Sequence, residues 1–223
     1  MNAQQVGAMA SLRAVLFDFD GTLIDSYPAI TASVNHVRQL YGLPPLDEAE
    51  VRPFVGRGAG ALLKHTVPAG SLEDNAAAYR AHHPSVLRSG TRLLPGAAEA
   101  LRALHERELR LGLCSNKPVA FSRELVAHLG VASFLDVVLG PEDVAQPKPA
   151  PDMVLTAMSR LHIAASQTLY VGDMVVDIQT GRGAGVTVWV VATGSDTVET
   201  LRLAKPDRLL HSLHELPALL TAG

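Results

Sequence analysis

Two acids separated by one residue, Asp18 and Asp20, are the feature of this chain whose spacing most directly suggests chemistry. They end an apolar run, residues 14–19, and Gly21 follows them. If that run is a strand, both carboxylates project from the same face at its end. Adjacent carboxylates repel each other unless a proton or a cation lies between them, and Mg²⁺ prefers such oxygen ligands. The alternative is a strand that ends in solvated acids at an Asp-Gly turn.

A hydroxyl and an amide follow another strand-like run. Ser115 and Asn116 come directly after residues 110–114, and Pro118 precedes a helical stretch. The free N–H groups at the start of a helix bind anions, so this segment could hold a phosphate group. It could equally be a simple helix cap, because Ser and Asn are favoured at that position and Pro in the first turn.

A lysine and two further acids complete the set of candidate residues. Lys148 lies between two prolines in the run QPKPAPD, and a stiff backbone suits a cation held in one place. A loop lysine that faces solvent fits the same run. Asp173 follows the apolar residues 168–171, and Asp177 lies one helical turn further on, so both can face one centre. Asp177 alone would also suit a helix N-cap.

Together and in this order, the four segments resemble the motifs of the haloacid dehalogenase-like (HAD) hydrolases. The resemblance implies that Asp18 attacks phosphorus and forms an aspartyl-phosphate. It implies that Asp20 is the general acid, which protonates the leaving alkoxide and then deprotonates the attacking water. Lys148 is expected to neutralise the nucleophile and the phosphoryl group. The core residues expected to bind phosphate or substrate are Thr22, Ser115 and Asn116.

The same resemblance implies Mg²⁺ as the cofactor. Asp18 and Asp173 are expected to supply carboxylates and Asp20 its backbone carbonyl. Asp177 is expected to bind the ion directly or through water. Haloacid dehalogenases lack the second acid of the first motif, so Asp20 argues against dehalogenation. Phosphonatases use a lysine in their cap domain, and Lys64 lies instead in a helical stretch typical of a solvated lysine.

Strand-length apolar runs alternate with helix-length amphipathic stretches, which predicts an α/β fold with a doubly wound, Rossmann-like parallel sheet. The candidate residues follow these strands, where such sheets bind ligands. Residues 24–91 contain no convincing strand and resemble the small all-helical cap domain of the family. The expected domains are a HAD catalytic core, residues 1–23 and 92–223, and a helical cap, residues 24–91. The expected strands are residues 14–19, 110–114, 137–139, 168–171 and 187–191, and the helices outside the cap are 97–107, 118–129, 151–161 and 177–184.

One loop of the expected cap suggests a substrate. Residues 55–59, VGRGA, are similar to the loop that opens the cap helix in phosphoglycolate phosphatases. Arg57 is expected to reach a carboxylate at the far end of the substrate, although a flexible loop with an exposed arginine fits equally. The implied function is Mg²⁺-dependent hydrolysis of a small phosphate monoester, phosphoglycolate foremost. The alternatives are a pyrophosphatase, a nucleotidase, a sugar-phosphate phosphatase or phosphomutase, and a non-enzymatic phosphate-sensing or scaffolding protein.

Composition limits the setting in which this chemistry takes place. The 223 residues are 48% hydrophobic and 18% charged, as in soluble globular proteins. A net charge of −3 without a basic block gives no reason to expect a nucleic-acid partner. Apolar runs are too short to span a membrane, residues 1–11 are expected to be a disordered extension, and the single Cys114 suits a reducing compartment. We therefore expect a cytoplasmic monomer or homodimer that acts on a small phosphorylated metabolite.

Overall fold

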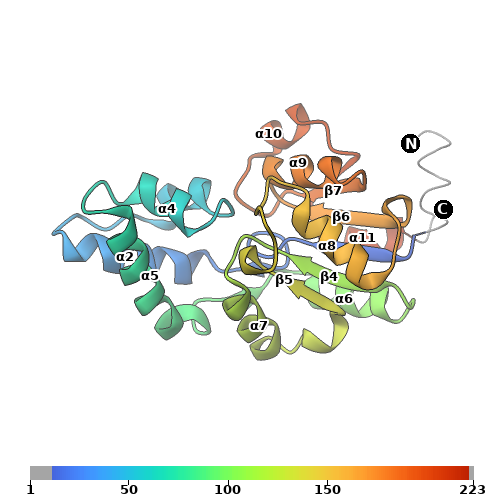
Figure 1. Ribbon diagram of the computed structural model, residues 1–223, viewed down its shortest axis with the longest axis horizontal. Helices are drawn as coiled ribbons and strands as arrows, with labels where there is room; N and C mark the ends of the chain where they lie inside the picture. The colour runs from blue at the N-terminus through green and yellow to red at the C-terminus, as the bar shows by residue number, and fades with distance from the viewer. Residues whose placement is uncertain (1–11, 221–223) are drawn as a thin grey trace.

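A parallel sheet lies at the centre of the protein, in a computed structural model that describes residues 12–220 (Figure 1). Within that range the sheet has six strands in the order β5-β4-β1-β6-β7-β8, and each neighbouring pair is parallel. The strands are β1 (Ala14–Phe17), β4 (Arg110–Cys114), β5 (Val137–Leu139), β6 (Thr168–Gly172), β7 (Thr187–Val191) and β8 (Arg208–Leu210). This order, with β1 in the middle, confirms the predicted α/β class.

The register of the central strands fixes where the polar residues emerge. Phe17, near the end of β1, pairs with Leu113 of β4 on one side and with Val171 of β6 on the other. The three strands therefore end at the same level. Residues that follow them in the sequence are delivered to one edge of the sheet, where a doubly wound fold has its ligand site.

Both faces of the sheet are covered by helices, as strands buried on two sides require. Val15 and Phe17 pack into one hydrophobic cluster and Leu16 into another, because successive side chains on a strand alternate in direction. The helices outside residues 24–91 are α6 (Ala97–His105), α7 (Val119–His128), α8 (Asp152–Leu161), α9 (Val175–Gly183), α10 (Val198–Leu203) and α11 (Glu215–Leu219). Short 3-10 turns lie at Ala132–Phe134, Pro141–Asp143 and Ala165–Gln167.

Residues 24–91, here called the helical insert, lie beside the sheet at one end of the molecule (Figure 1). The insert has a hydrophobic cluster of its own, in which Tyr27 and Leu63 are fully buried. Its helices are α2 (Tyr27–Leu40), α3 (Glu48–Val51), α4 (Ala59–Thr66) and α5 (Leu72–Leu87), with a 3-10 turn at Arg52–Phe54.

The expectation that the insert contains no strand is wrong at its first two residues. β2 (Ile24–Asp25) pairs antiparallel with β3 (Arg92–Leu93), so the two chain crossings into and out of the insert form a short ribbon. The Arg92 guanidinium also lies 2.5 Å from the Asp25 carboxylate across this ribbon. A two-residue strand shows no alternation that a sequence pattern could reveal.

The other differences from the expected elements are small. The expected strand at residues 14–19 ends at Phe17, and β8, α10 and α11 were not expected. The expected N-terminal extension, residues 1–11, lies outside the described residues. Across residues 12–220, no helix has the length and hydropathy needed to cross a bilayer.

Candidate active site

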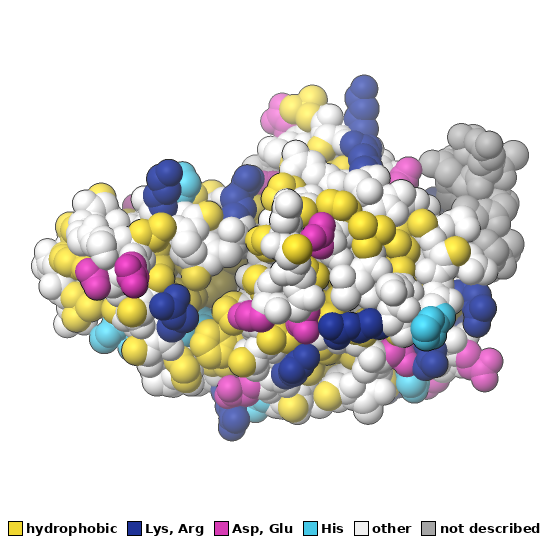
Figure 2. Space-filling view, in the orientation of Figure 1, with side chains coloured by type: hydrophobic (Ala, Val, Ile, Leu, Met, Phe, Trp, Pro, Cys, Tyr) yellow, Lys and Arg dark blue, Asp and Glu magenta, His cyan; other side chains and the backbone are white. Residues whose placement is uncertain are grey.

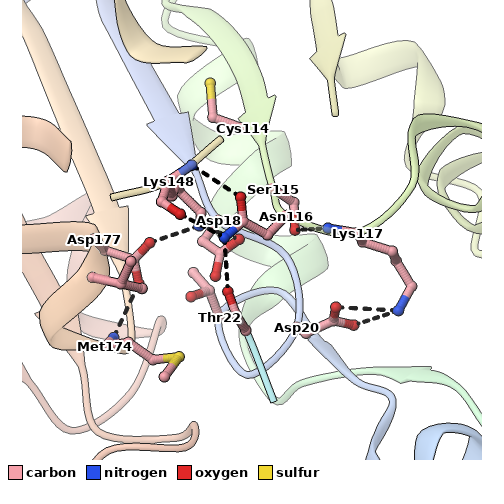
Figure 3. Close-up of polar contacts among 12 residues, drawn as sticks. Asp18, Asp20, Thr22, Cys114, Ser115, Asn116, Lys117, Lys148, Met174 and Asp177 are labelled. Atoms are coloured by element: carbon pink, nitrogen blue, oxygen red, sulfur yellow. Dashed lines mark hydrogen bonds and ion pairs between the residues drawn. The ribbon is translucent and has the colours of Figure 1, made fainter. Parts of the chain in front are cut away.

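The carboxyl ends of β1, β4 and β6 bring together most of the residues singled out in the sequence (Figure 3). Asp18 follows β1, Ser115 follows β4 and Asp173 follows β6, and all three are buried. Lys148, from the loop before α8, and Asp177, from the first turn of α9, reach the same centre. The resulting group is a set of charges held away from bulk water.

Lys148 is the cation of this centre. Its Nζ lies 2.8 Å from Asp18 Oδ1 and donates to Asp177 Oδ1 at 2.7 Å. Burial alone would lower the pKa of Lys148, but the Asp177 and Asp18 carboxylates outweigh it and raise the pKa above its usual value. The lysine therefore stays charged in the interior, which disfavours the alternative of a solvent-facing loop lysine.

The Asn116 side chain fixes the loop that carries this lysine. Its Oδ1 accepts from the Lys148 backbone N–H at 3.0 Å, and its Nδ2 donates to the Lys148 carbonyl at 3.1 Å. The same Nδ2 donates to the carbonyl of Gly56 in the helical insert, also at 3.1 Å. The Asn116 amide thus forms hydrogen bonds both to the loop that carries Lys148 and to the helical insert.

Three buried acids crowd the same centre. Asp18, Asp173 and Asp177 each offer an oxygen atom within 4.8 Å of the others. Burial raises the pKa of Asp18 to about 6, although Lys148 opposes the change. Burial, followed by the charges of Asp177 and Asp18, raises the pKa of Asp173 well above its usual value. One ammonium does not balance three carboxylates, so the site favours an additional cation.

The hydrogen bonds of these acids show which of them fit a metal ion. Asp18 Oδ1 is buried and accepts no hydrogen bond of normal geometry within the described residues. Asp173 accepts one bond on each oxygen, from Thr22 Oγ1 at 2.8 Å and from the Ser195 N–H at 2.9 Å. Each Asp173 oxygen keeps a second lone pair. Asp18 and Asp173 therefore suit direct coordination of a hard cation.

Asp177 is already engaged by the protein. Its Oδ2 accepts from the backbone N–H groups of Asp173 at 3.2 Å and Met174 at 3.0 Å. Met174 is the N-cap of α9. Asp177 Oδ1 accepts from Lys148, and the Tyr170 hydroxyl lies 3.0 Å from the same oxygen. Asp177 is therefore not the N-cap of α9; it lies in the first turn and accepts from the N-cap N–H while it also takes part in the charged centre. Because these donors take up most of its lone pairs, Asp177 acts on the centre mainly through Lys148.

Asp20 departs from the geometry expected for it. Because β1 ends at Phe17, strand alternation does not continue to Asp20, and its carboxylate turns to Lys117 (Figure 3). Lys117 Nζ donates to the two Asp20 oxygens at 2.9 and 3.1 Å, and the Ser26 hydroxyl donates to one of them. Burial would raise the pKa of Asp20, but Lys117 and these hydrogen bonds hold it below its usual value.

Ser115 and Asn116 do not cap the helix that follows them. The N-cap of α7 is Pro118, and the Val119 N–H in the first turn of that helix donates to Glu142 Oε2 at 3.0 Å, not to Ser115 or Asn116. Ser115 Oγ accepts instead from the Lys117 backbone N–H at 3.3 Å. A buried hydroxyl at the end of β4, the strand that pairs with β1, is consistent with the anion-binding interpretation.

Several contributors were not singled out in the sequence. Lys117 directly follows Ser115 and Asn116 in the sequence and pairs with Asp20, and Ser195 lies in the turn after β7 and donates to Asp173. A Cβ at Gly194 would lie 1.7 Å from Asp173 Oδ2, so only glycine permits this close approach. Gly194 and Ser195 could have been found from their place in the sequence, because they follow a buried strand as the other site residues do.

A pocket leads from Asp20 toward the helical insert, and Figure 2 shows a hollow where the insert meets the rest of the protein. The lining comes from both sides of this junction: Asp20, Asn116, Lys117, Pro118 and Phe121 from the sheet side, and Ile30, Val55, Gly56, Gly58, Ala59, Leu62, Tyr79 and His83 from the insert. Arg57 is exposed and lines a different hollow, together with Pro53, Phe54, Ala61 and His65. The two glycines that flank Arg57 thus face the pocket while its side chain lies elsewhere.

Comparison with known proteins defines the class. The sequence profile of the haloacid dehalogenase-like hydrolases matches residues 15–191, so the chain belongs to this family. It is 38% identical over 193 residues to a phosphoglycolate phosphatase of Rhodospirillum rubrum, a match that covers 82% of this chain and 80% of that protein. It is 33% identical over 233 residues to the phosphoglycolate phosphatase of Escherichia coli K12, covering 93% and 92%.

Solved structures agree on the fold. A predicted phosphoglycolate phosphatase from Haemophilus somnus superposes with a TM-score of 0.88 at 23% identity, covering 94% of this chain and 98% of that one. A haloacid dehalogenase-like family protein from Streptococcus pneumoniae superposes with a TM-score of 0.83 at 22% identity, covering 94% and 99%. Both cover the sheet and the helical insert together.

Proposed function

We propose that this protein is a phosphatase that hydrolyses phosphoglycolate through an aspartyl-phosphate on Asp18. The observation that carries the proposal is the buried Asp18 carboxylate, with Lys148 Nζ 2.8 Å away and Asp173 beside it at the end of the central strands. The relatives named phosphoglycolate phosphatase, which match over most of the chain, support the choice of substrate. The substrate class is accordingly a small phosphorylated metabolite.

The proposed reaction has two steps. In the first, Asp20 leaves Lys117 and takes up a proton from solvent; an Asp18 oxygen then attacks phosphorus, the bond to the glycolate oxygen breaks, and Asp20 gives that oxygen its proton. In the second, Asp20 takes a proton from water, whose oxygen attacks the phosphorus and releases inorganic phosphate from Asp18. Lys148, the Ser115 hydroxyl and the Asn116 backbone N–H stabilise the negative phosphoryl oxygens. Asp20 must be free of Lys117 for the proton transfer in both steps.

Mg²⁺ fits the acidic group. Asp18 and Asp173 would hold it with their carboxylates and Asp20 with its backbone carbonyl, while Asp177 lies next to it. When bound, the ion supplies positive charge that offsets the phosphoryl oxygens and the crowded carboxylates. Thr22 then acts by orienting Asp173, to which it donates a hydrogen bond.

The domain roles follow from the same proposal. Residues 1–23 and 92–223 form the catalytic core, and residues 24–91 act as a cap that excludes water from the phosphoryl group. The β2–β3 ribbon, where the insert joins the sheet, is the place for a hinge between them.

The test is a comparison of kcat/KM for phosphoglycolate with the values for pyrophosphate, a nucleoside monophosphate and a hexose phosphate, all with Mg²⁺. We expect phosphoglycolate to give the highest value, and both Asp18→Asn and treatment with EDTA to abolish turnover. Preference for another of these esters would refute the substrate, and full turnover by Asp18→Asn would refute the nucleophile.

A further inference from the structure

The pocket beside Asp20 contains a buried ion pair that the two reaction steps do not require. Lys117 Nζ lies 2.9 and 3.1 Å from the two Asp20 oxygens. The side chains of both residues are largely buried, with 4% and 8% of their surfaces exposed. Lys117 therefore occupies the pocket next to the group that must meet the leaving oxygen.

Lys117 is also the cation of this pocket. His83 is the other basic residue among the described residues that line it. Burial and the nearby Lys117 ammonium lower the pKa of His83 to about 3, so its ring is neutral near pH 7. The remaining lining is mainly apolar. An anionic group that enters the pocket thus meets one full positive charge, on Lys117.

A buried ammonium is costly to leave without a partner, because its desolvation is then uncompensated. If Asp20 turns toward the substrate, another anion must replace it at Lys117. Phosphoglycolate carries such an anion, since a carboxylate lies at the end opposite its phosphate.

We propose that Lys117 binds the carboxylate of the substrate, which replaces Asp20 as the partner of the ammonium. The proposal rests on phosphoglycolate hydrolysis as the proposed function and names the residue that selects this substrate. Binding of the substrate carboxylate and release of Asp20 are then a single exchange of partners at Lys117. Once released, Asp20 no longer has the ammonium that lowers its pKa, so it can take up from solvent the proton that it gives to the leaving oxygen. An ester with an uncharged end leaves Asp20 held by Lys117.

Arg57 is the competing candidate, because its sequence context favours the same role. It is exposed, and it lines the hollow formed with Phe54 and His65 instead of the pocket at Asp20. Arg57 therefore provides a matched control, since it is a second cation of the same protein on a loop whose flanking glycines reach the pocket.

The experiment compares phosphoglycolate with ethyl phosphate, which has nearly the same size but ends in a methyl group. For each variant the ratio of the two kcat/KM values is measured, so that losses common to both esters cancel. We expect Lys117→Met to lower this ratio by about 10- to 100-fold, the effect of one charge-assisted hydrogen bond. Arg57→Met should leave the ratio within about twofold, and Lys117→Arg should retain most of it.

The outcomes separate the two proposals. If the unaltered protein does not prefer phosphoglycolate to ethyl phosphate, the proposed function fails. If it does, and Lys117→Met keeps the full ratio or Arg57→Met loses it, only the role of Lys117 is overturned.

A further measurement needs no variant and so does not depend on the folding of Lys117→Met. 2-Aminoethyl phosphate, which presents an ammonium to Lys117, should be hydrolysed more slowly than ethyl phosphate by the unaltered protein. Equal rates for these two esters would contradict a cation at that end of the pocket.

Discussion

Replacing Asp177 with Asn separates its two possible roles, as a metal ligand and as the partner of Lys148. The amide has one oxygen and cannot accept both from Lys148 at 2.7 Å and from the N–H groups of Asp173 and Met174. Losing a charge-assisted hydrogen bond costs about 1.5–3 kcal/mol. If the lost hydrogen bond stabilises the transition state more than the bound substrate, kcat decreases by about 10- to 100-fold. The Mg²⁺ concentration for half-maximal activity should change much less.

The assay is a Mg²⁺ titration of phosphoglycolate hydrolysis by Asp177→Asn, with Asp173→Asn as the matched control. Asp173 retains free lone pairs, so its replacement should raise the Mg²⁺ requirement. Thermal denaturation of both variants checks that each is folded. The reasoning is refuted if Asp177→Asn raises the Mg²⁺ requirement as much as Asp173→Asn and recovers its full kcat at saturating Mg²⁺.

Three further predictions concern the neighbouring residues. Asp20→Asn should slow phosphoglycolate hydrolysis by about 10²–10⁴-fold, and p-nitrophenyl phosphate less, because p-nitrophenolate leaves without a proton; equal losses would contradict a general acid. Gly56→Ala should lower kcat/KM, because its Cβ would lie 2.3 Å from Met174 Sδ at a φ of 96°; partial recovery in Gly56→Ala with Met174→Ala would assign the loss to this contact. His83 has its pKa lowered from 6.5 to about 3 by burial first, so the unfolded chain binds its proton more readily. Its contribution to stability is therefore complete above pH 6.5 and is lost as the pH falls toward 3, and urea unfolding of His83→Gln should show a weaker pH dependence over that range.

The sequence was sufficient to predict the residues that follow the central strands. Asp18, Ser115 and Asp173 were each placed after an apolar run, and parallel register alone brings such positions to one edge. Lys148 was found because its proline-flanked run is unusual. These predictions depend on local sequence pattern and on the fact that the carboxyl ends of parallel strands lie at the same edge of a sheet.

The partner of Asp20 could not be found in this way. Lys117 is 97 residues further along the chain, and nothing in its local sequence distinguishes it from a surface lysine. Ser195 reaches Asp173 through its backbone N–H, which every residue except proline possesses. The orientation of Arg57 depends on how the insert packs. Such contacts follow from tertiary packing and leave no periodic signal in the sequence.

The Asn116 amide has a consequence for motion of the insert. Its two N–H groups serve the carbonyls of Lys148 and Gly56, so moving the insert away leaves one donor without its protein acceptor. The position of the insert and the order of the Lys148 loop are thereby energetically coupled, and such coupling is reciprocal. If the insert closes over the site as proposed, a phosphoryl group that holds Lys148 in place would favour the closed insert, and release of phosphate would weaken the same closure. On that proposal, release of phosphate would itself favour opening of the insert.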